Sequence, residues 1–168
     1  MINTVDRLFS AYGGHTHEDR PLRGYAGLVA VFNALVGGEI VAARLLQART
    51  LERLSPGDIV LLALATHKLS RLITKDAVTS IIRAPFTTFE SNAGDGEVQE
   101  GARGTGIQHA MGEVLTCPFC FGQWILTVLV FGLFVKPGVT RVLAGACAAL
   151  TGADFLHVAY GIARKYAD

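Results

Sequence analysis

The chain has 168 residues, of which 51% are hydrophobic and 17% are charged, and its mean hydropathy is +0.39. An average soluble domain is about 25% charged, so this balance argues against an ordinary soluble enzyme. With 15 Lys and Arg against 14 Asp and Glu, the net charge of +1 gives no general field for binding nucleic acid. The three cysteines are too few for a secreted disulfide scaffold. The length suits one domain, and we expect residues 1–168 to form a single membrane domain.

Four stretches approach the roughly 20 mostly apolar residues that a membrane helix needs. We predict spans at about residues 24–43, 58–73, 118–135 and 139–163. The second is preceded by Ser55 as a candidate N-cap, with Pro56 at the first helical position and Asp58 in the first turn. The expected fold is therefore an all-α integral membrane four-helix bundle.

Small residues recur at four-residue spacing on the first and fourth spans, which would let another helix approach closely. They are Ala30, Ala34 and Gly38 on the first span and Gly145, Ala149 and Ala153 on the fourth. These faces predict a homo-oligomer or hetero-oligomer in the lipid bilayer.

The distribution of basic residues predicts the orientation of the spans. Residues 1–20 are too charged for a signal peptide, so we expect the first span to act as its own signal. Ten basic residues fall on one side: Arg7, Arg20, Arg23, Lys68, Arg71, Lys75, Arg83, Arg103, Arg164 and Lys165. Five fall on the other side: Arg44, Arg49, Arg53, Lys136 and Arg141. The excess predicts that both termini lie in the cytoplasm.

The connector at residues 74–111 divides into two parts. In the first part, Ala77, Ile81 and Ile82 share one side of an expected interfacial helix that Pro85 would end, and Lys75 and Arg83 would attract anionic lipid. Residues 91–106 are glycine-rich and predict a mobile loop. This loop lacks the Gly-Lys-Ser/Thr ending of a phosphate loop, so no nucleotide is expected.

Polar residues on three spans converge on the cytoplasmic leaflet. His67, Ser70 and Arg71 share a face of the second span, Cys117-Pro118-Phe119-Cys120 opens the third, and Asp154 and His157 share a face of the fourth. Two thiolates and two imidazoles suit zinc, so the expected metal ligands are Cys117, Cys120, His67 and His157, with Asp154 as an acceptor for an imidazole N–H.

Each of these residues also has a plain structural interpretation. The two histidines would form interhelical hydrogen bonds, Lys68 and Arg71 would reach lipid headgroups, and Trp124 would serve in packing. Cys147 would fill space between alanines, and solvent would surround His15 and His17.

The same Cys117–Cys120 pair permits a redox interpretation. Pro118 suits the first helical position, which would make Cys117 the cap and place Cys120 in the first turn, where a thiol is activated. Such pairs occur in dithiol oxidoreductases. A cytoplasmic pair meets a reducing pool, however, and the chain has no second cysteine pair to pass electrons onward. No catalytic residue is assigned, and the balance is against an enzyme.

The chain resembles an uncharacterised family of small bacterial membrane proteins, domain of unknown function 1360. The residues that carry the resemblance are Thr66-His67-Lys68-Leu69-Ser70-Arg71, Lys75-Asp76, Arg83-Ala84-Pro85-Phe86, Leu115-Thr116-Cys117-Pro118-Phe119-Cys120, Gly122, Trp124 and Asp154-Phe155-Leu156-His157. The resemblance implies a multi-pass protein of the bacterial inner membrane with no assigned activity.

Three hypotheses follow from the sequence. The leading one is a non-enzymatic multi-pass membrane protein whose Cys/His site is structural or binds zinc. The alternatives are a membrane thiol-disulfide oxidoreductase and a packing or assembly subunit of a larger membrane complex.

Overall fold

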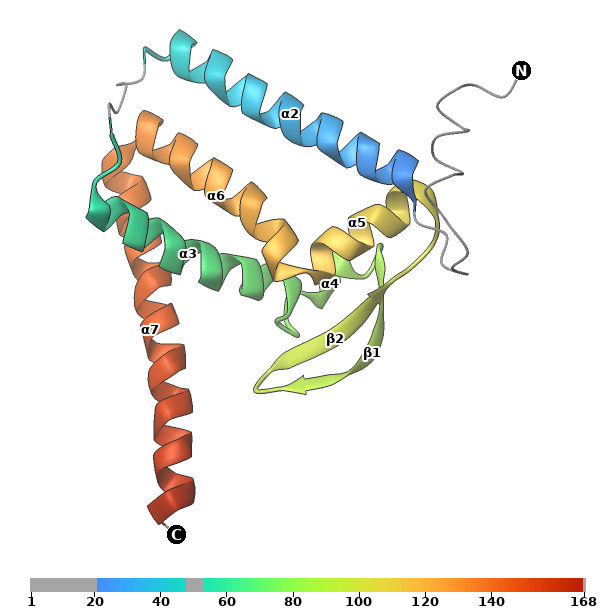
Figure 1. Ribbon diagram of the computed structural model, residues 1–168, viewed down its shortest axis with the longest axis vertical. Coiled ribbons are helices and arrows are strands. Elements are labelled where there is room, and N and C mark those ends of the chain that lie inside the picture. Colours follow the sequence, from blue (N-terminus) through green and yellow to red (C-terminus); the bar gives the residue numbers. More distant parts are fainter. Residues whose placement is uncertain (1–20, 48–52, 168) are drawn as a thin grey trace.

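The computed structural model describes residues 21–47 and 53–167, which are mostly helical (Figure 1). The helices are α2 (Leu22–Leu45), α3 (Pro56–Thr74), α4 (Ser80–Arg83), α5 (Gly106–Thr116), α6 (Pro118–Val135) and α7 (Pro137–Ala167). The strands are β1 (Thr87–Gly94) and β2 (Glu97–Ala102). Arg7, His15, His17, Arg20 and Arg49 lie outside the described residues.

Three of the described helices are long and apolar enough to cross a membrane: α2, α6 and α7. They coincide with three of the four expected spans, with α2 and α7 slightly longer than predicted. The fourth, α3, forms a helix of 19 residues but is not among them, and it carries Asp58, Lys68 and Arg71. The all-α expectation is confirmed in its coarse form, because the described residues are mostly helical but include a small two-stranded sheet; the four-helix membrane bundle stays a prediction.

Helices α3 and α6 begin as their sequences predict. Ser55 Oγ accepts a hydrogen bond from the N–H of Asp58 at 3.0 Å, and Pro56 occupies the first turn. At the start of α6, Cys117 Sγ accepts from the N–H of Cys120 at 3.2 Å. Both caps satisfy a first-turn N–H that has no partner within its own helix.

Helices α2 and α6 run in the same direction, with their first residues near α5 (Figure 1). Phe32 of α2 packs edge-on against Trp124 of α6, with ring centroids 5.1 Å apart, so Trp124 serves in packing as expected. Nearer the start of α2, the hydroxyl of Tyr25 donates to Glu113 of α5. An added Cβ at Gly24 would lie 2.6 Å from the carbonyl oxygen of Gly106, so this close approach requires glycine.

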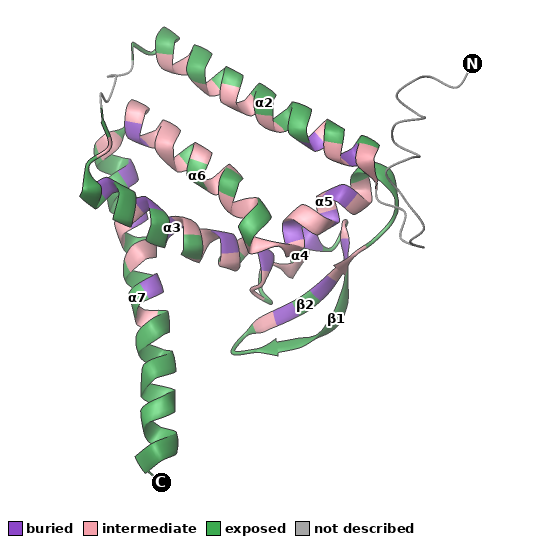
Figure 2. Ribbon diagram, in the orientation of Figure 1, coloured by how far each residue is buried: buried purple, intermediate pink, exposed green. Residues whose placement is uncertain are grey.

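Residues 141–154 of α7 pack against α3 through polar contacts. Arg141 Nε donates to Asp58 at 2.8 Å, and Thr151 Oγ1 donates to the carbonyl of Leu64 at 2.9 Å. Beyond this point Lys68 pairs with Asp154 at 2.7 Å. Because these contacts advance together along both helices, the chain runs in the same sense in α3 and α7 where they touch, although α7 diverges from α3 toward its end (Figure 1). The last part of α7 extends away from the other helices and is almost entirely exposed (Figure 2).

The expectation of a mobile loop at residues 91–106 is wrong for most of its length. Strands β1 and β2 pair as an antiparallel hairpin, with Thr87 opposite Ala102 and Gly94 opposite Glu97. The turn places Gly94, Asp95 and Gly96 at φ values of 92°, 47° and 82°. Glycine adopts this left-handed backbone without the steric cost that a Cβ adds.

The connector after α3 also differs from the expected interfacial helix. Only Ser80–Arg83 is α-helical there, and Arg83 is fully buried inside the protein instead of facing lipid. Val78 and Ile81 are 85% and 80% exposed on the outer surface. The apolar side of this segment is therefore available to a bilayer, whereas the basic contribution expected from Arg83 is absent.

Candidate site between helices α3 and α6

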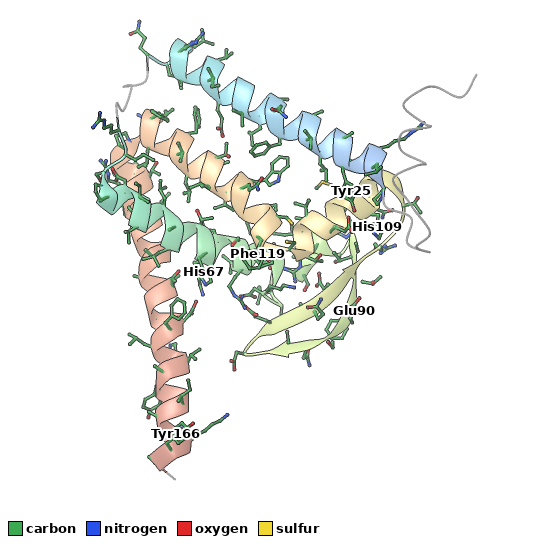
Figure 3. The ribbon with its side chains drawn as sticks, viewed as in Figure 1. Tyr25, His67, Glu90, His109, Phe119 and Tyr166 are labelled. Carbon is green, nitrogen blue, oxygen red and sulfur yellow. The ribbon has the colours of Figure 1, made fainter. Side chains whose placement is uncertain are left out.

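A groove with a volume of about 390 Å³ runs between α3 and α6. Its lining residues are Ala63, Thr66, His67, Ser70, Arg71, Pro118, Phe119, Gly122, Gln123 and Leu126. On each helix these positions follow one another at steps of one and three residues, the spacing of a single helix face, so one face of each helix lines the groove. The two helices run in opposite directions, which places the end of α3 beside the start of α6 (Figure 3).

One end of the groove is attached to the hairpin. Arg71 donates through Nε and Nη2 to Oε1 of Glu97, at 3.1 and 2.7 Å. The neighbouring backbone adds two hydrogen bonds, from Val98 N to the Lys75 carbonyl and from Ala77 N to the Gly96 carbonyl, both 2.9 Å long. The expectation that Arg71 reaches a lipid headgroup is therefore incomplete, because two nitrogens of its guanidinium donate hydrogen bonds to Glu97.

The groove contains one buried polar atom without a partner. The hydroxyl oxygen of Thr66 is buried, and no hydrogen-bond partner for it exists among residues 21–47 and 53–167. Across the groove, an added Cβ at Gly122 would meet the Thr66 methyl group at 3.6 Å, which is ordinary contact. Because Gly122 has no side chain, backbone atoms of α6 line the groove at this position.

The structure places the expected zinc ligands in different surroundings. His67 lines the groove and stacks on Phe155 of α7, with ring centroids 6.0 Å apart. His157 is exposed on the part of α7 that extends beyond the other helices. Asp154, expected to accept from an imidazole, instead pairs with Lys68.

Cys117 and Cys120 lie at the start of α6, where both are free thiols. Across the described ranges, no three His, Cys, Asp or Glu side chains gather closely enough to hold a metal ion. The donors present therefore do not form the tetrahedral set that zinc prefers. The assignment of zinc to Cys117, Cys120, His67 and His157 stays a prediction.

A buried ion pair that the sequence interpretation missed lies beside the site. The guanidinium of Arg83 donates through Nε to Glu100 Oε2 at 2.8 Å, and Ser80 and Thr87 donate to the same carboxylate at 2.6 and 2.9 Å. Burial acts to raise the pKa of Glu100, but the hydrogen bonds from Arg83, Ser80 and Thr87 outweigh it and lower the pKa to about 2. Glu100 is therefore ionised at neutral pH.

Arg83 also completes the end of α3. Its Nη1 donates to the carbonyl of Ile73 at 2.7 Å, one of the last-turn carbonyls that lack a partner within a helix. Nη2 donates to the carbonyl of Asp76 at 3.0 Å. One side chain thus joins α3, the connector and β2.

A family model described as protein of unknown function (DUF1360) matches residues 61–160, more than half of the chain. The chain belongs to this family. It is 33% identical over 99 residues to the sporulation protein YjcA of Bacillus subtilis (strain 168), an alignment that covers 56% of this chain and 84% of that protein. It is 28% identical over 119 residues to the UPF0713 protein YngL of the same organism, over 70% of this chain and 89% of YngL. No solved structure matches the chain.

The DUF1360 match covers both walls of the groove, from Leu61 on α3 through the whole of α6. The motifs that carried the resemblance thus meet in space: Thr66, His67, Ser70 and Arg71 face Pro118, Phe119 and Gly122. The groove belongs to the part of the chain that defines the family.

Proposed function

We propose that this protein is a four-span membrane protein that holds a rigid folded head at one membrane surface and acts as a structural or assembly component, not as an enzyme. The head comprises the connector, the β1–β2 hairpin and α5. The observation that carries the proposal is the attachment of the head to α3 through the Arg71–Glu97 ion pair and the hydrogen bond from Arg83 to the Ile73 carbonyl.

The path of the chain supports a fourth span at α3. Helices α2 and α6 both start at the head, so the chain must return from the far end of α2 before α6 begins. Helix α3 makes this return, and its 19 residues extend about 28 Å, close to the thickness of a bilayer core. Its polar side chains are paired with α7 or the head, which lowers the cost of placing them in a membrane.

The proposed location is the bacterial inner membrane, with the head and both termini in the cytoplasm. The basic residues of the described head side, among them Arg71, Lys75 and Arg103, support this orientation. One relative is named a sporulation protein, so we include sporulation as the process to examine where the host forms spores.

The zinc site is a second candidate, favoured by one observation: His67 and Pro118, the residue after Cys117, line the same groove. Zinc binding would require these donors to move closer together, because no three of them gather within the described part of the chain. The thiol oxidoreductase remains an alternative for the same cysteines.

Complementation of a deletion strain tests the proposal. A chain with both Cys117 and Cys120 changed to Ser should restore the function of the deleted gene, because Ser still caps α6 and an assembly role needs no thiol chemistry. A chain with Glu97 and Glu100 both changed to Ala should fail, because its head is detached. Loss of function in the Ser variant, at normal membrane abundance, would favour zinc or redox chemistry instead.

A further inference from the structure

The α3–α6 groove changes character along its length. Arg71 and Ser70 stand at one end beside Pro118 and Phe119, whereas Ala63 and Leu126 stand at the other. The positions from Ala63 to Arg71 extend about 12 Å along the helix. A ligand that follows the groove therefore needs a polar end and an apolar end.

Within residues 21–47 and 53–167, some hydrogen-bond donors at the polar end have no acceptor. Arg71 uses Nε and Nη2 on Glu97, which leaves Nη1. Pro118 has no N–H, and Cys117 accepts from the N–H groups of Cys120 and Phe121, so the Phe119 N–H remains in the first turn of α6. A guanidinium and a helix N-terminus together bind phosphate oxygens well.

The charges around this end nearly cancel. Arg71 pairs with Glu97, and Lys68, on the adjacent face of α3, pairs with Asp154. Hydrogen bonding to a phosphodiester, not a net positive field, would therefore hold the ligand. A zwitterionic and an anionic headgroup should be accepted alike.

We propose that this groove binds one phospholipid, with its phosphodiester at Arg71 and an acyl chain passing Gly122 toward Ala63 and Leu126. The inference rests on the proposed position of α3 in the bilayer. There, the groove opens between two membrane helices, beside the 89% exposed ring of Phe119, where lipid is the abundant amphiphile. The cavity volume lies within the range typical of small-molecule sites.

Native mass spectrometry of the purified full-length chain in detergent tests the proposal. The probes are phosphatidylethanolamine, phosphatidylglycerol and diacylglycerol with identical acyl chains. We expect one phospholipid to be retained per chain from either phospholipid, and diacylglycerol to bind about tenfold more weakly because it lacks the phosphodiester.

Variants locate the binding in the groove. Gly122→Leu, and independently Ala63→Leu on the opposite wall, should fill the groove and weaken retention about tenfold or more. Gly122→Ala should bind like the unaltered chain, because its Cβ fits at 3.6 Å from Thr66. Ala163→Leu, at an exposed position of α7, is the matched control for added bulk.

Equal retention by the unaltered chain and both groove-filling variants would overturn the proposal, as would equal binding of diacylglycerol. The outcome is separable from the proposed topology. If mapping placed α3 outside the bilayer while the groove variants still lost phospholipid, the four-span proposal would fail and the site would stand.

Discussion

Arg83 and Glu100 are 17 residues apart in the chain, yet Arg83 Nε lies 2.8 Å from Glu100 Oε2 and their side chains are 0% and 5% exposed. Buried charges of this kind are stable only when paired and hydrogen-bonded, because transfer out of water is costly. The guanidinium of Arg83 makes six hydrogen-bond contacts with its five N–H groups, and Glu100 accepts from three side chains. The pair therefore fixes the hairpin to the end of α3.

Removing one partner of the Arg83–Glu100 pair should lower the stability of the protein more than removing both partners. Arg83→Met leaves the Glu100 carboxylate buried without its counter-ion and should cost about 3–5 kcal/mol of stability. Arg83→Met combined with Glu100→Leu should cost less than the single Arg83→Met change. Thermal unfolding in detergent, analysed as a double-mutant cycle, measures the coupling; additive effects would show that the two residues do not interact.

The low pKa of Glu100 predicts a dependence of stability on pH. Its pKa is lowered from the ordinary 4.5 to about 2, so its stabilising contribution is complete above about pH 4.5 and is lost as the pH falls toward 2. Thermal unfolding of the unaltered chain and of Glu100→Gln should differ most at neutral pH and converge near pH 2. A constant difference across this range would contradict the ionised, paired state.

Local signals made part of the fold predictable from sequence. Ser55-Pro56 and Cys117-Pro118 each combine a capping side chain with proline at the first helical position, and both helices begin there. The lengths and apolar compositions of α2, α6 and α7 were enough to predict these helices from sequence. These features depend on residues that are neighbours in the chain.

The head was not predictable in the same way. The Asp95-Gly96 pair is a common hairpin turn and was the available signal, but the flanking segments lack the alternation of apolar residues that marks a strand. The burial of Arg83 depends on its ion pair with Glu100 of the hairpin. The position of the Arg71 side chain likewise depends on its ion pair with Glu97. Because of these nonlocal pairs, residues expected to contact lipid or solvent instead form ion pairs within the protein.

The exposed apolar side of the connector predicts contact with the bilayer. Val78, Ile81 and Ile82 are exposed where α3 ends, close to the membrane surface in the proposed topology. With Trp124 changed to Phe, a tryptophan at Ile82 should be quenched by brominated lipid in proteoliposomes. The same replacement at Asn92, exposed on β1, is the control and should be quenched weakly. Equal quenching at both positions would contradict this placement.

Reporter fusions provide a direct test of where α6 and α7 cross the membrane. Fusions in the Gly94–Gly96 turn and after Ala167 should report the cytoplasm, and a fusion at Lys136 should report export. The parallel run of α3 and α7 predicts that the end of α7 returns to the side of the head. A cytoplasmic signal at Lys136 would mean that α6 does not cross.

The role of Cys117 separates the three interpretations of the thiol pair. The structure shows Cys117 Sγ accepting from the N–H of Cys120, which a serine hydroxyl can also do. For a structural cap, Cys117→Ser should keep stability near that of the unaltered chain, whereas Cys117→Ala should lose about 0.5–2 kcal/mol.

If Cys117, Cys120, His67 and His157 bind zinc, metal analysis should instead give close to one zinc per chain, and both substitutions should release it and lower the melting temperature together. If the pair is a redox couple, mild oxidant should form a Cys117–Cys120 disulfide in a metal-free protein, and either substitution should prevent it. Thermal unfolding, metal content and thiol titration of the same three proteins therefore identify which chemistry the start of α6 performs.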